Sequence, residues 1–240
     1  MFSVLFEVCP KPDQWEAYLD YAKMLRPELE IIDGFVDNVR YRSLTRKGWI
    51  LSLSSWRDEK SLVRWRTKMR HHAVQDRARS HILTDYHLRV GEVTYDTRIL
   101  ERGTLHEQRL DETEVGEATA VTLIDAKRPA HQAETSTVDR FAEWLGIAPF
   151  KDFLSWDIFE AVLTPGDLIV LINWRDAAAA KEFEESTKLT ERVRCRRVRI
   201  VRDYGMYDRR EAPQYFPDAP NRKTVHCEPT QRQPEDSRIK

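Results

Sequence analysis

The feature that most constrains this 240-residue chain is a strand-to-helix junction that occurs twice. The largely apolar stretch 49–55 leads into Trp-Arg-Asp at 56–58, and the stretch 167–173 leads into the same three residues at 174–176. Short apolar runs of this kind predict buried strands. Asp is a favoured helix N-cap, because its carboxylate accepts hydrogen bonds from the free N–H groups of the first turn. The segments after both junctions have helical spacing or strong helix formers, so we expect two related halves.

The elements around the two junctions also correspond. Each half begins with a short strand and an amphipathic helix, opens a second strand before the junction, and ends with a closing strand. We place first strands at 4–8 and 120–124, helices from near Pro12 and Ser136, second strands from 34–36 and 148–150, and closing strands at 87–96 and 201–208. The order β-α-β-β-α-β predicts an α+β, ferredoxin-like layer: four antiparallel strands with two helices on one face.

One face of each predicted sheet has no cover within its own half. Two such sheets packed face to face would bury both faces, as in a dimeric α/β barrel, either within one chain or between two chains. We therefore divide the chain into an N-terminal domain at 1–96, a linker at 97–117, a degenerate second domain at 118–208, and a Pro-rich tail at 209–240 that we expect to be mobile.

Composition limits the function only broadly. The net charge is −1, which provides no overall attraction to nucleic acid or to anionic membranes. No stretch approaches the roughly 20 apolar residues of a membrane span. The three cysteines lie far apart without a C-x-x-C pair, so neither a disulfide framework nor a metal site is expected. Arginines alternate along 192–202, and pairing with the glutamates of the preceding helix explains them most simply. We expect a cytoplasmic protein that does not bind membranes, and we regard nucleic-acid binding through these arginines as a disfavoured alternative.

Four motifs of the first half resemble one known family. They are Ser-Trp-Arg-Asp at 55–58, the helix at 59–66, His-His-Ala-Val-Gln at 71–75, and the closing strand at 85–90. With these motifs, residues 2–96 resemble the antibiotic biosynthesis monooxygenase (ABM) domain of the dimeric α/β-barrel superfamily. Residues 119–208 look like a degenerate second copy in tandem, because the helix after their junction has no histidine.

The resemblance implies an oxygenase-type enzyme that acts with O2 on a small aromatic or polycyclic phenol or quinol, in a pocket of the N-terminal half. In the leading interpretation no cofactor is required, since a base deprotonates the substrate and the anion itself reduces O2. In a variant, His71 or His72 binds heme. The alternative is a non-catalytic ligand-binding or assembly module of the same fold. A homodimer is left open.

Heme-degrading relatives typically use an Asn in the first strand, a Trp on the second helix, and a His about ten residues later. In this chain the corresponding residues are Phe6 or Glu7, Trp65 and Gln75. Two of the three features therefore depart from that pattern.

The candidate catalytic residues are His71, His72 and Glu7. The histidines are expected at a break after Arg70, where one could act as a base and the other could be a solvated or capping residue. Neighbouring helical residues point about 100° apart, so at most one of them faces a cavity. Alternation places Glu7 either in solvent or inside the barrel, where burial would raise its pKa and suit it to acid–base chemistry.

The candidate substrate-binding residues are Trp65, Asn38, Tyr41 and Tyr86. Trp65 would form either an aromatic wall for a planar substrate or part of the core. The other three are polar groups on strands, which would reach the cavity or serve as surface and structural hydrogen-bonding groups. The two junction tryptophans are expected to be packing residues, because both halves have them.

Overall fold

A computed structural model describes residues 1–99, 116–128, 145, 153–187 and 193–206. Most of the predicted linker, the whole predicted tail, the helix expected from near Ser136 and the strand start at 148–150 lie outside the described residues. The side chains at 70–72 also lie outside this description.

The first half contains four strands, three α-helices, one short 3-10 helix and one short π-helix. In chain order they are β1 (Phe2–Pro10), η1 (Pro12–Gln14), α1 (Trp15–Glu30), β2 (Phe35–Ser43), β3 (Ile50–Trp56), α2 (Glu59–Arg66), α3 (Met69–Arg77), η2 (Ala78–Ile82) and β4 (Leu83–Asp96). The described part of the second half contains β5 (Ala120–Lys127), β6 (Phe153–Ala161), β7 (Asp167–Trp174), α5 (Ala177–Ser186) and β8 (Arg194–Gly205).

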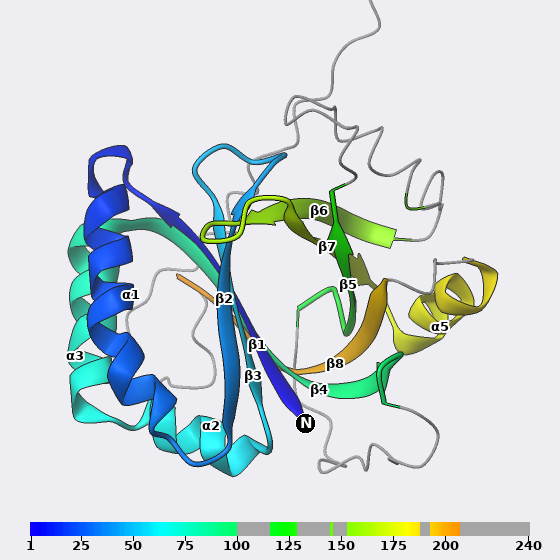
Figure 1. Ribbon diagram of the computed structural model, residues 1–240, viewed down its shortest axis with the longest axis horizontal. Coiled ribbons are helices and arrows are strands. Elements are labelled where there is room, and N and C mark those ends of the chain that lie inside the picture. The colour runs from blue at the N-terminus through cyan, green and yellow to red at the C-terminus, as the bar shows by residue number, and fades with distance from the viewer. Residues whose placement is uncertain (100–115, 129–144, 146–152, 188–192, 207–240) are drawn as a thin grey trace, which may run out of the picture.

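The eight strands form one closed, antiparallel barrel in the order β1-β3-β2-β6-β7-β5-β8-β4 (Figure 1). The halves meet along two seams. At one seam β2 pairs with β6, with Tyr41 opposite Ala161. At the other β4 pairs with β8, with Leu88 opposite Tyr204. The barrel therefore closes within a single chain, which answers the question that the sequence left open.

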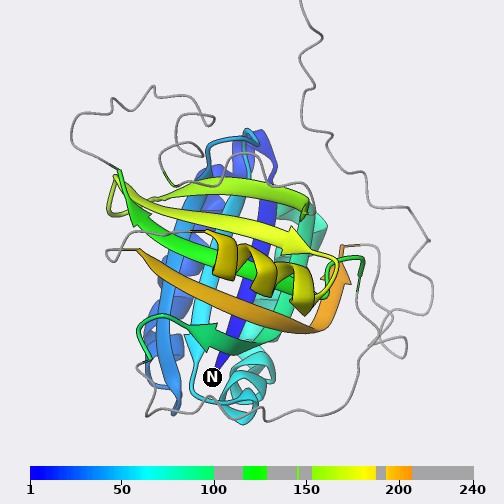
Figure 2. The same cartoon turned by 90° about the vertical axis from the view of Figure 1, so that its right-hand side faces the viewer.

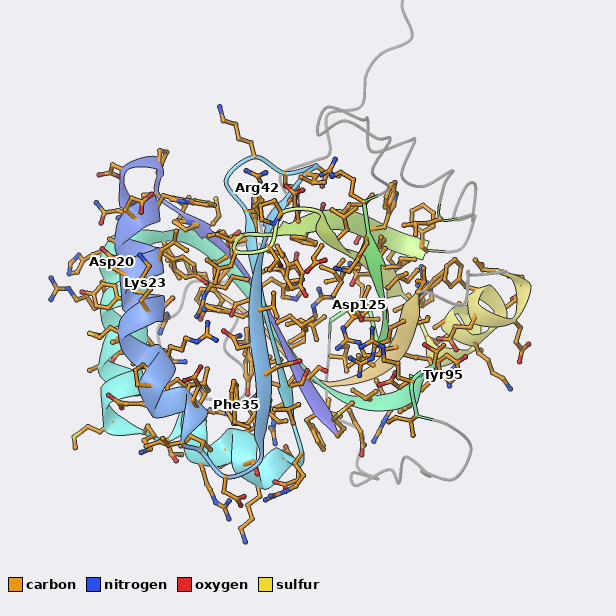
Figure 3. The ribbon with its side chains drawn as sticks, in the orientation of Figure 1. Asp20, Lys23, Phe35, Arg42, Tyr95 and Asp125 are labelled. Carbon is orange, nitrogen blue, oxygen red and sulfur yellow. The ribbon has the colours of Figure 1, made fainter. Side chains whose placement is uncertain are left out.

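Alternation along the strands decides which side chains enter the barrel. The interior is a core of apolar residues from both halves, including Leu5, Leu51, Leu53, Val121, Leu123, Phe159, Ile169, Leu171 and Val198. Asp125 also points into the barrel, where it pairs with Arg196 at 3.0 Å (Figure 3). Asp20 and Lys23 lie on the outer surface of α1.

The helices cover the outer faces of the barrel. In the first half, α1, α2 and α3 lie over the outer face of β1, β2 and β3 (Figure 1). In the second half, α5 lies over the outer face of the sheet (Figure 2). No helix in the described ranges is long and apolar enough to cross a membrane.

The repeated junction is present in the structure. Trp56 and Trp174 are both fully buried, which confirms their packing role. Asp58 accepts a hydrogen bond from the Ser61 N–H at 2.8 Å, and Asp176 accepts one from the Ala179 N–H at 2.9 Å. Both aspartates are thus N-caps, as the sequence predicted.

The expected helix break after Arg70 was wrong. The chain leaves the helical conformation earlier, at Lys68, whose φ of −62° and ψ of 124° are extended. Thr67 ends α2, where its hydroxyl donates to the carbonyl oxygen of Val63 at 3.0 Å. The backbones of His71 and His72 consequently lie inside α3 and not between two helices.

Candidate active site

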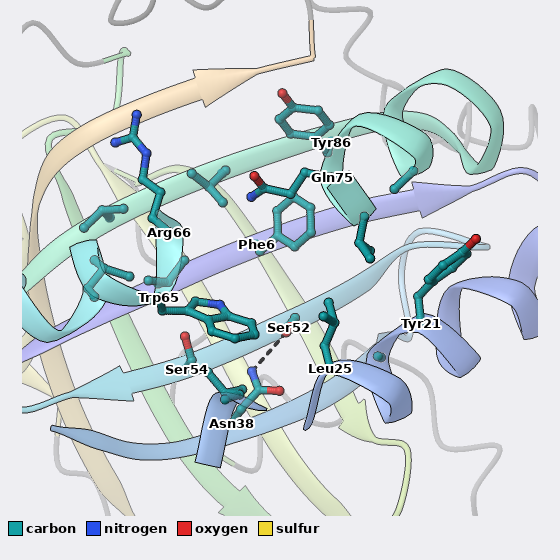
Figure 4. A pocket seen from close by; sticks show the side chains of 18 of the residues that line it. Phe6, Tyr21, Leu25, Asn38, Ser52, Ser54, Trp65, Arg66, Gln75 and Tyr86 are labelled. Atoms are coloured by element: carbon teal, nitrogen blue, oxygen red, sulfur yellow. Dashed lines mark hydrogen bonds between the residues drawn. The ribbon is translucent and has the colours of Figure 1, made fainter. Parts of the chain in front are cut away.

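A cavity of about 790 Å³ lies between the outer face of the first half's sheet and the helices α1, α2 and α3 (Figure 4). Strands β1 to β4 form its floor, and the end of β8 contributes Arg202 and Tyr204. Aromatic and aliphatic side chains form the larger part of the lining, and polar and charged side chains form the rest. This size and composition are typical of a site for a small organic molecule.

Strand register places the floor residues side by side. Phe6 of β1 pairs with Ser52 of β3, and Asn38 of β2 pairs with Ser54 of β3. All four side chains line the cavity, because residues two apart on a strand share a face. The Asn38 amide donates to the Ser52 hydroxyl at 3.0 Å and to the Leu53 carbonyl oxygen at 3.2 Å (Figure 4).

Three of the four predicted substrate-binding residues line this cavity: Trp65, Asn38 and Tyr86. Tyr86 forms an edge-on contact with Phe6, with ring centroids 5.6 Å apart. Burial raises the pKa of Tyr86, so its phenol stays protonated at neutral pH. The three residues come from β4, α2 and β2 and share one apolar space, which is an arrangement suited to binding a ring-containing substrate.

Tyr41 lies on the other face of the sheet. It belongs to the barrel core with Val39 and Phe159 and is 7% exposed. Asn38 and Tyr41 are three residues apart on one strand, so alternation cannot place both in the same cavity. The prediction that Tyr41 lines the same site as Asn38 is therefore wrong, because the two side chains point to opposite faces of β2.

Glu7 also faces the barrel interior and does not line the cavity. It accepts hydrogen bonds from Arg89 and Arg46. Burial alone would raise the pKa of Glu7, but the positive charges of Arg89, Arg46 and His87 outweigh burial and lower this pKa to about 2. The expected raised pKa was therefore wrong, because the sequence does not indicate that two arginines converge on one carboxylate.

These charges form a network that joins the two halves inside the barrel. Arg46 pairs with Glu7 of the first half and with Asp157 of the second half, the latter at 2.7 Å. Arg89, which is 1% exposed, contacts Glu7 and Asn173. A buried ion pair of this kind is costly to break, because removal of one partner leaves an uncompensated charge.

The backbones of His71 and His72 lie in α3, and Val74 and Gln75 of the same helix line the cavity. Their side chains lie outside the described residues, so their catalytic role stays a prediction. Phe6, Trp65 and Gln75, which correspond to the three positions used by heme-degrading relatives, all line the cavity (Figure 4). Gln75 occupies the position of the heme-ligating His, and an amide is a poor fit to that role.

Among the polar lining residues that sequence reasoning missed are Arg40 and Tyr18. Arg40 lies two residues after Asn38, so its position on the same strand face was available from alternation. Tyr18 lies on α1, and the helical spacing indicates only that it belongs to the apolar face of this helix. The Tyr18 phenol and the Arg40 guanidinium are hydrogen-bonded, and burial raises the pKa of Tyr18 despite this neighbouring charge.

The alternating arginines of β8 are paired with acids. Arg194 contacts Asp96 at 2.6 Å, Arg197 contacts Glu184 at 2.9 Å, and Arg199 contacts Glu92 at 3.0 Å, while Arg196 and Arg202 pair with Asp125 and Glu59. These partners neutralise the described part of the stripe, and among these five arginines Arg197 is the one that pairs with a glutamate of the preceding helix.

A closed α/β barrel with a largely apolar cavity under the helices of its outer face is the architecture of a protein that binds a small organic molecule. A family model described as antibiotic biosynthesis monooxygenase matches residues 1–77. A protein of Pyricularia oryzae (strain 70-15) called jasmonate monooxygenase ABM is 46% identical over 225 residues, which cover 91% of this chain and 100% of that protein. The chain therefore belongs to the antibiotic biosynthesis monooxygenase family and is a monooxygenase-like enzyme.

Solved structures provide a comparison of the fold. A crystal structure of aldoxime dehydratase has a TM-score of 0.52 at 11% identity and covers 85% of this chain and 83% of its own. An aldoxime dehydratase in complex with butyraldoxime has a TM-score of 0.52 at 10% identity and covers 85% and 81%. At such low identity the likeness concerns the fold alone.

Proposed function

We propose that the chain is a monooxygenase that inserts one oxygen atom of O2 into jasmonate, or into a closely related cyclopentanone acid, bound in the cavity of the first half. The observation that carries this proposal is the cavity of about 790 Å³ with its apolar and aromatic lining. The relative with 46% identity, whose name gives jasmonate as its substrate, supports the choice of substrate. Jasmonate has a cyclopentanone ring and a pentenyl chain, whose hydrocarbon surfaces suit such a lining.

A phenol or quinol is the second candidate substrate, and the aromatic groups Phe6, Trp65 and Tyr86 around the cavity favour it. The two candidates differ in their electron source. A phenolate can itself give electrons to O2, so that one oxygen atom enters the product and the other leaves as water without a cofactor. A cyclopentanone acid is not electron-rich, so its oxygenation needs a separate two-electron donor such as a reduced nicotinamide.

In the phenol reaction, a base removes the phenolic proton, and we keep His71 or His72 as the proposed base. Heme bound by one of these histidines remains the proposed variant. Gln75 at the position of the usual ligand does not fit heme bound as in the heme-degrading relatives, and no step of the proposal depends on heme.

The test is incubation of the purified protein with jasmonic acid and with a panel of phenols and quinols under 18O2, with and without reduced nicotinamide or ascorbate. Mass spectrometry should show one labelled oxygen atom in the product. Ala22 lines the cavity on α1 and is 8% exposed, so Ala22→Phe should occupy part of the cavity and reduce turnover. The same substitution at the exposed Ala178 of α5 is the matched control. No labelled product with any substrate would overturn the proposal.

The histidines are tested separately. His71→Ala and His72→Ala should differ, because at most one side chain faces the cavity, and only one variant should lose turnover. His81→Ala is the control, since His81 is exposed in η2. Adding hemin to the wild type and to each variant tests the heme variant, through a Soret shift that one histidine substitution removes.

We infer further that the chain is a tandem pair of ferredoxin-like repeats with its boundary at 97–117. Two features support this: the halves have strand orders β4-β1-β3-β2 and β8-β5-β7-β6, and each has a capped helix after its Trp-Arg-Asp junction. Separate expression of residues 1–117 and 118–240 tests it, since the two fragments should associate if each is a complete repeat.

A further inference from the structure

The lining of the cavity contains more basic groups than a purely apolar substrate needs. Five arginines line it: Arg26, Arg40, Arg66, Arg79 and Arg202. Two of them have carboxylate partners in their own surroundings. Arg26 contacts Glu30 at 2.7 Å, and Arg202 contacts Glu59 at 3.3 Å. Arg79 also has an interaction partner, which leaves Arg40 and Arg66.

Arg40 differs from its neighbours. It is half-buried on the floor strand β2, opposite Ser52, and two residues after Asn38. Its side-chain partner is the phenol of Tyr18, and within the described part of the chain it forms no salt bridge. Its Nε is buried and has no hydrogen-bond partner among the described residues. A guanidinium has five N–H donors, so a single neutral phenol leaves most of its hydrogen-bonding capacity available to a ligand.

We propose that Arg40, supported by Tyr18, binds the carboxylate of the substrate and restricts the enzyme to small apolar acids. The inference rests on the proposed function, because it concerns the same cavity. A guanidinium accepts a carboxylate in a bidentate manner, which fixes both the position and the orientation of the ligand. The protonated Tyr18 phenol adds a donor at the same place.

The rest of the cavity fits this assignment. Phe6, Trp65 and Leu88 line the same space and present apolar surface to the body of a ligand. A molecule anchored by its carboxylate at Arg40 would therefore place its ring and chain against these side chains. This orientation would hold the same carbon atom near the reacting O2 in each turnover, which is the usual benefit of an anchoring charge.

Arg66 is the natural comparison. It also lines the cavity, and its partner is the neutral Tyr204 hydroxyl at 3.3 Å. Unlike Arg40 it is exposed, so water solvates its charge and weakens its attraction to a ligand. Arg66→Met is thus a matched control for Arg40→Met, with the same substitution on the same cavity.

The test measures dissociation constants for jasmonic acid and for its methyl ester, which lacks the charge but keeps the body. Wild-type protein should bind the acid at least about tenfold more tightly than the ester, which corresponds to about 1.4 kcal/mol. Arg40→Met should lose about tenfold or more for the acid and change little for the ester. Arg40→Lys should restore part of the preference, and Arg66→Met should keep it.

The outcomes separate the inference from the proposed function. If the wild type oxygenates the acid but Arg40→Met keeps the preference for acid over ester, the assignment of Arg40 is wrong while the function stands. If the wild type binds and oxygenates neither compound, the choice of substrate itself is wrong, and the assignment falls with it. If Arg40→Met does not fold, Arg40→Gln decides, because it removes the charge but keeps a polar side chain: an unchanged preference for acid over ester in this variant overturns the inference.

Discussion

The two halves use the same junction but cover their sheets differently. After the second junction, α5 places Phe183 and Ala180 directly on the sheet, where both are fully buried. The ring centroids of Phe183 and Trp174 are 5.2 Å apart. After the first junction, α2 carries Trp65, which borders the cavity and is only half-buried. One scaffold thus yields a packed layer in one half and a binding space in the other, and the difference comes from the helix side chains.

The two halves differ on the outer face of the sheet but not on its inner face. On the inner face, both halves contribute apolar residues to one core, and Arg46 joins carboxylates from both. This shared inner core adds to the packing on the outer face of the first half, where Tyr18 and Leu29 of α1 are buried against the sheet. The core that stabilises the barrel and the cavity that would bind the ligand lie on opposite faces of the same strands.

The largest effect is expected from breaking the packed layer. Phe183→Ala removes a fully buried ring and should cost about 3–5 kcal/mol of unfolding free energy. Trp65→Ala should cost less than half as much, because this ring already borders a cavity, but it should reduce turnover strongly. Urea unfolding measures the first effect and product formation the second. Equal destabilisation by the two substitutions would contradict the difference between the halves.

The shared inner face predicts a second effect. Arg46→Met should cost about 3 kcal/mol, since Asp157 is left buried without its cation. Arg42→Met is the control: the Arg42 side chain is 54% exposed, and Glu160 keeps Arg128 at 2.7 Å, so this change should cost under about 1 kcal/mol. Chemical denaturation measures both. If the network joins the two halves, both halves of the Arg46→Met variant should unfold in one transition at a lower denaturant concentration. Separate unfolding of one half would contradict this.

Acid should weaken the same network. The pKa of Glu7 is about 2 in the folded chain, against an ordinary value of 4.5. A lowered folded-state pKa stabilises the protein above pH 4.5, and this contribution is lost as the pH falls from 4.5 to 2. It amounts to at most about 3 kcal/mol. Unfolding measured between pH 6 and pH 2 should show wild type and Glu7→Gln converging towards pH 2. A constant difference would indicate that Glu7 titrates normally.

Much of the scaffold was predictable because it depends on local patterns. The Trp-Arg-Asp junctions, the alternation of the strands and the capping aspartates each involve residues close in sequence, and the structure places Asp58 and Asp176 as expected. The break before α3 was misplaced because no Gly or Pro marks it. The side chain of Thr67 ends α2, and such a signal is too common to recognise in advance.

The site was predictable only in part, because its polar groups depend on contacts between distant segments. Trp65, Asn38 and Tyr86 could be assigned from their elements. The pKa of Glu7 depends on Arg46, which lies in the loop between β2 and β3, and on Arg89 of β4. Interactions of this kind appear only when register and barrel closure are known, and neither can be read from a single sequence.

The smallest effect tests whether the two junctions are equivalent. Asp58→Ala and Asp176→Ala should each cost about 1 kcal/mol, because each removes one N-cap. Hydrogen bonds from Arg57 and Ser61 lower the pKa of Asp58 to about 2. The loss caused by Asp58→Ala should therefore be complete above pH 4 and fade as the pH falls towards 2.

The two cap variants should differ in activity although they match in stability. Asp58 begins the helix that carries Trp65, so fraying of this helix would displace a wall of the cavity and raise the KM for the substrate. Asp176 begins a helix that borders no part of this cavity, so its loss should leave KM unchanged at a temperature where both variants are folded. A rise of KM in both variants would mean that the packed half also shapes the site, and the division between scaffold and site would then have to be abandoned.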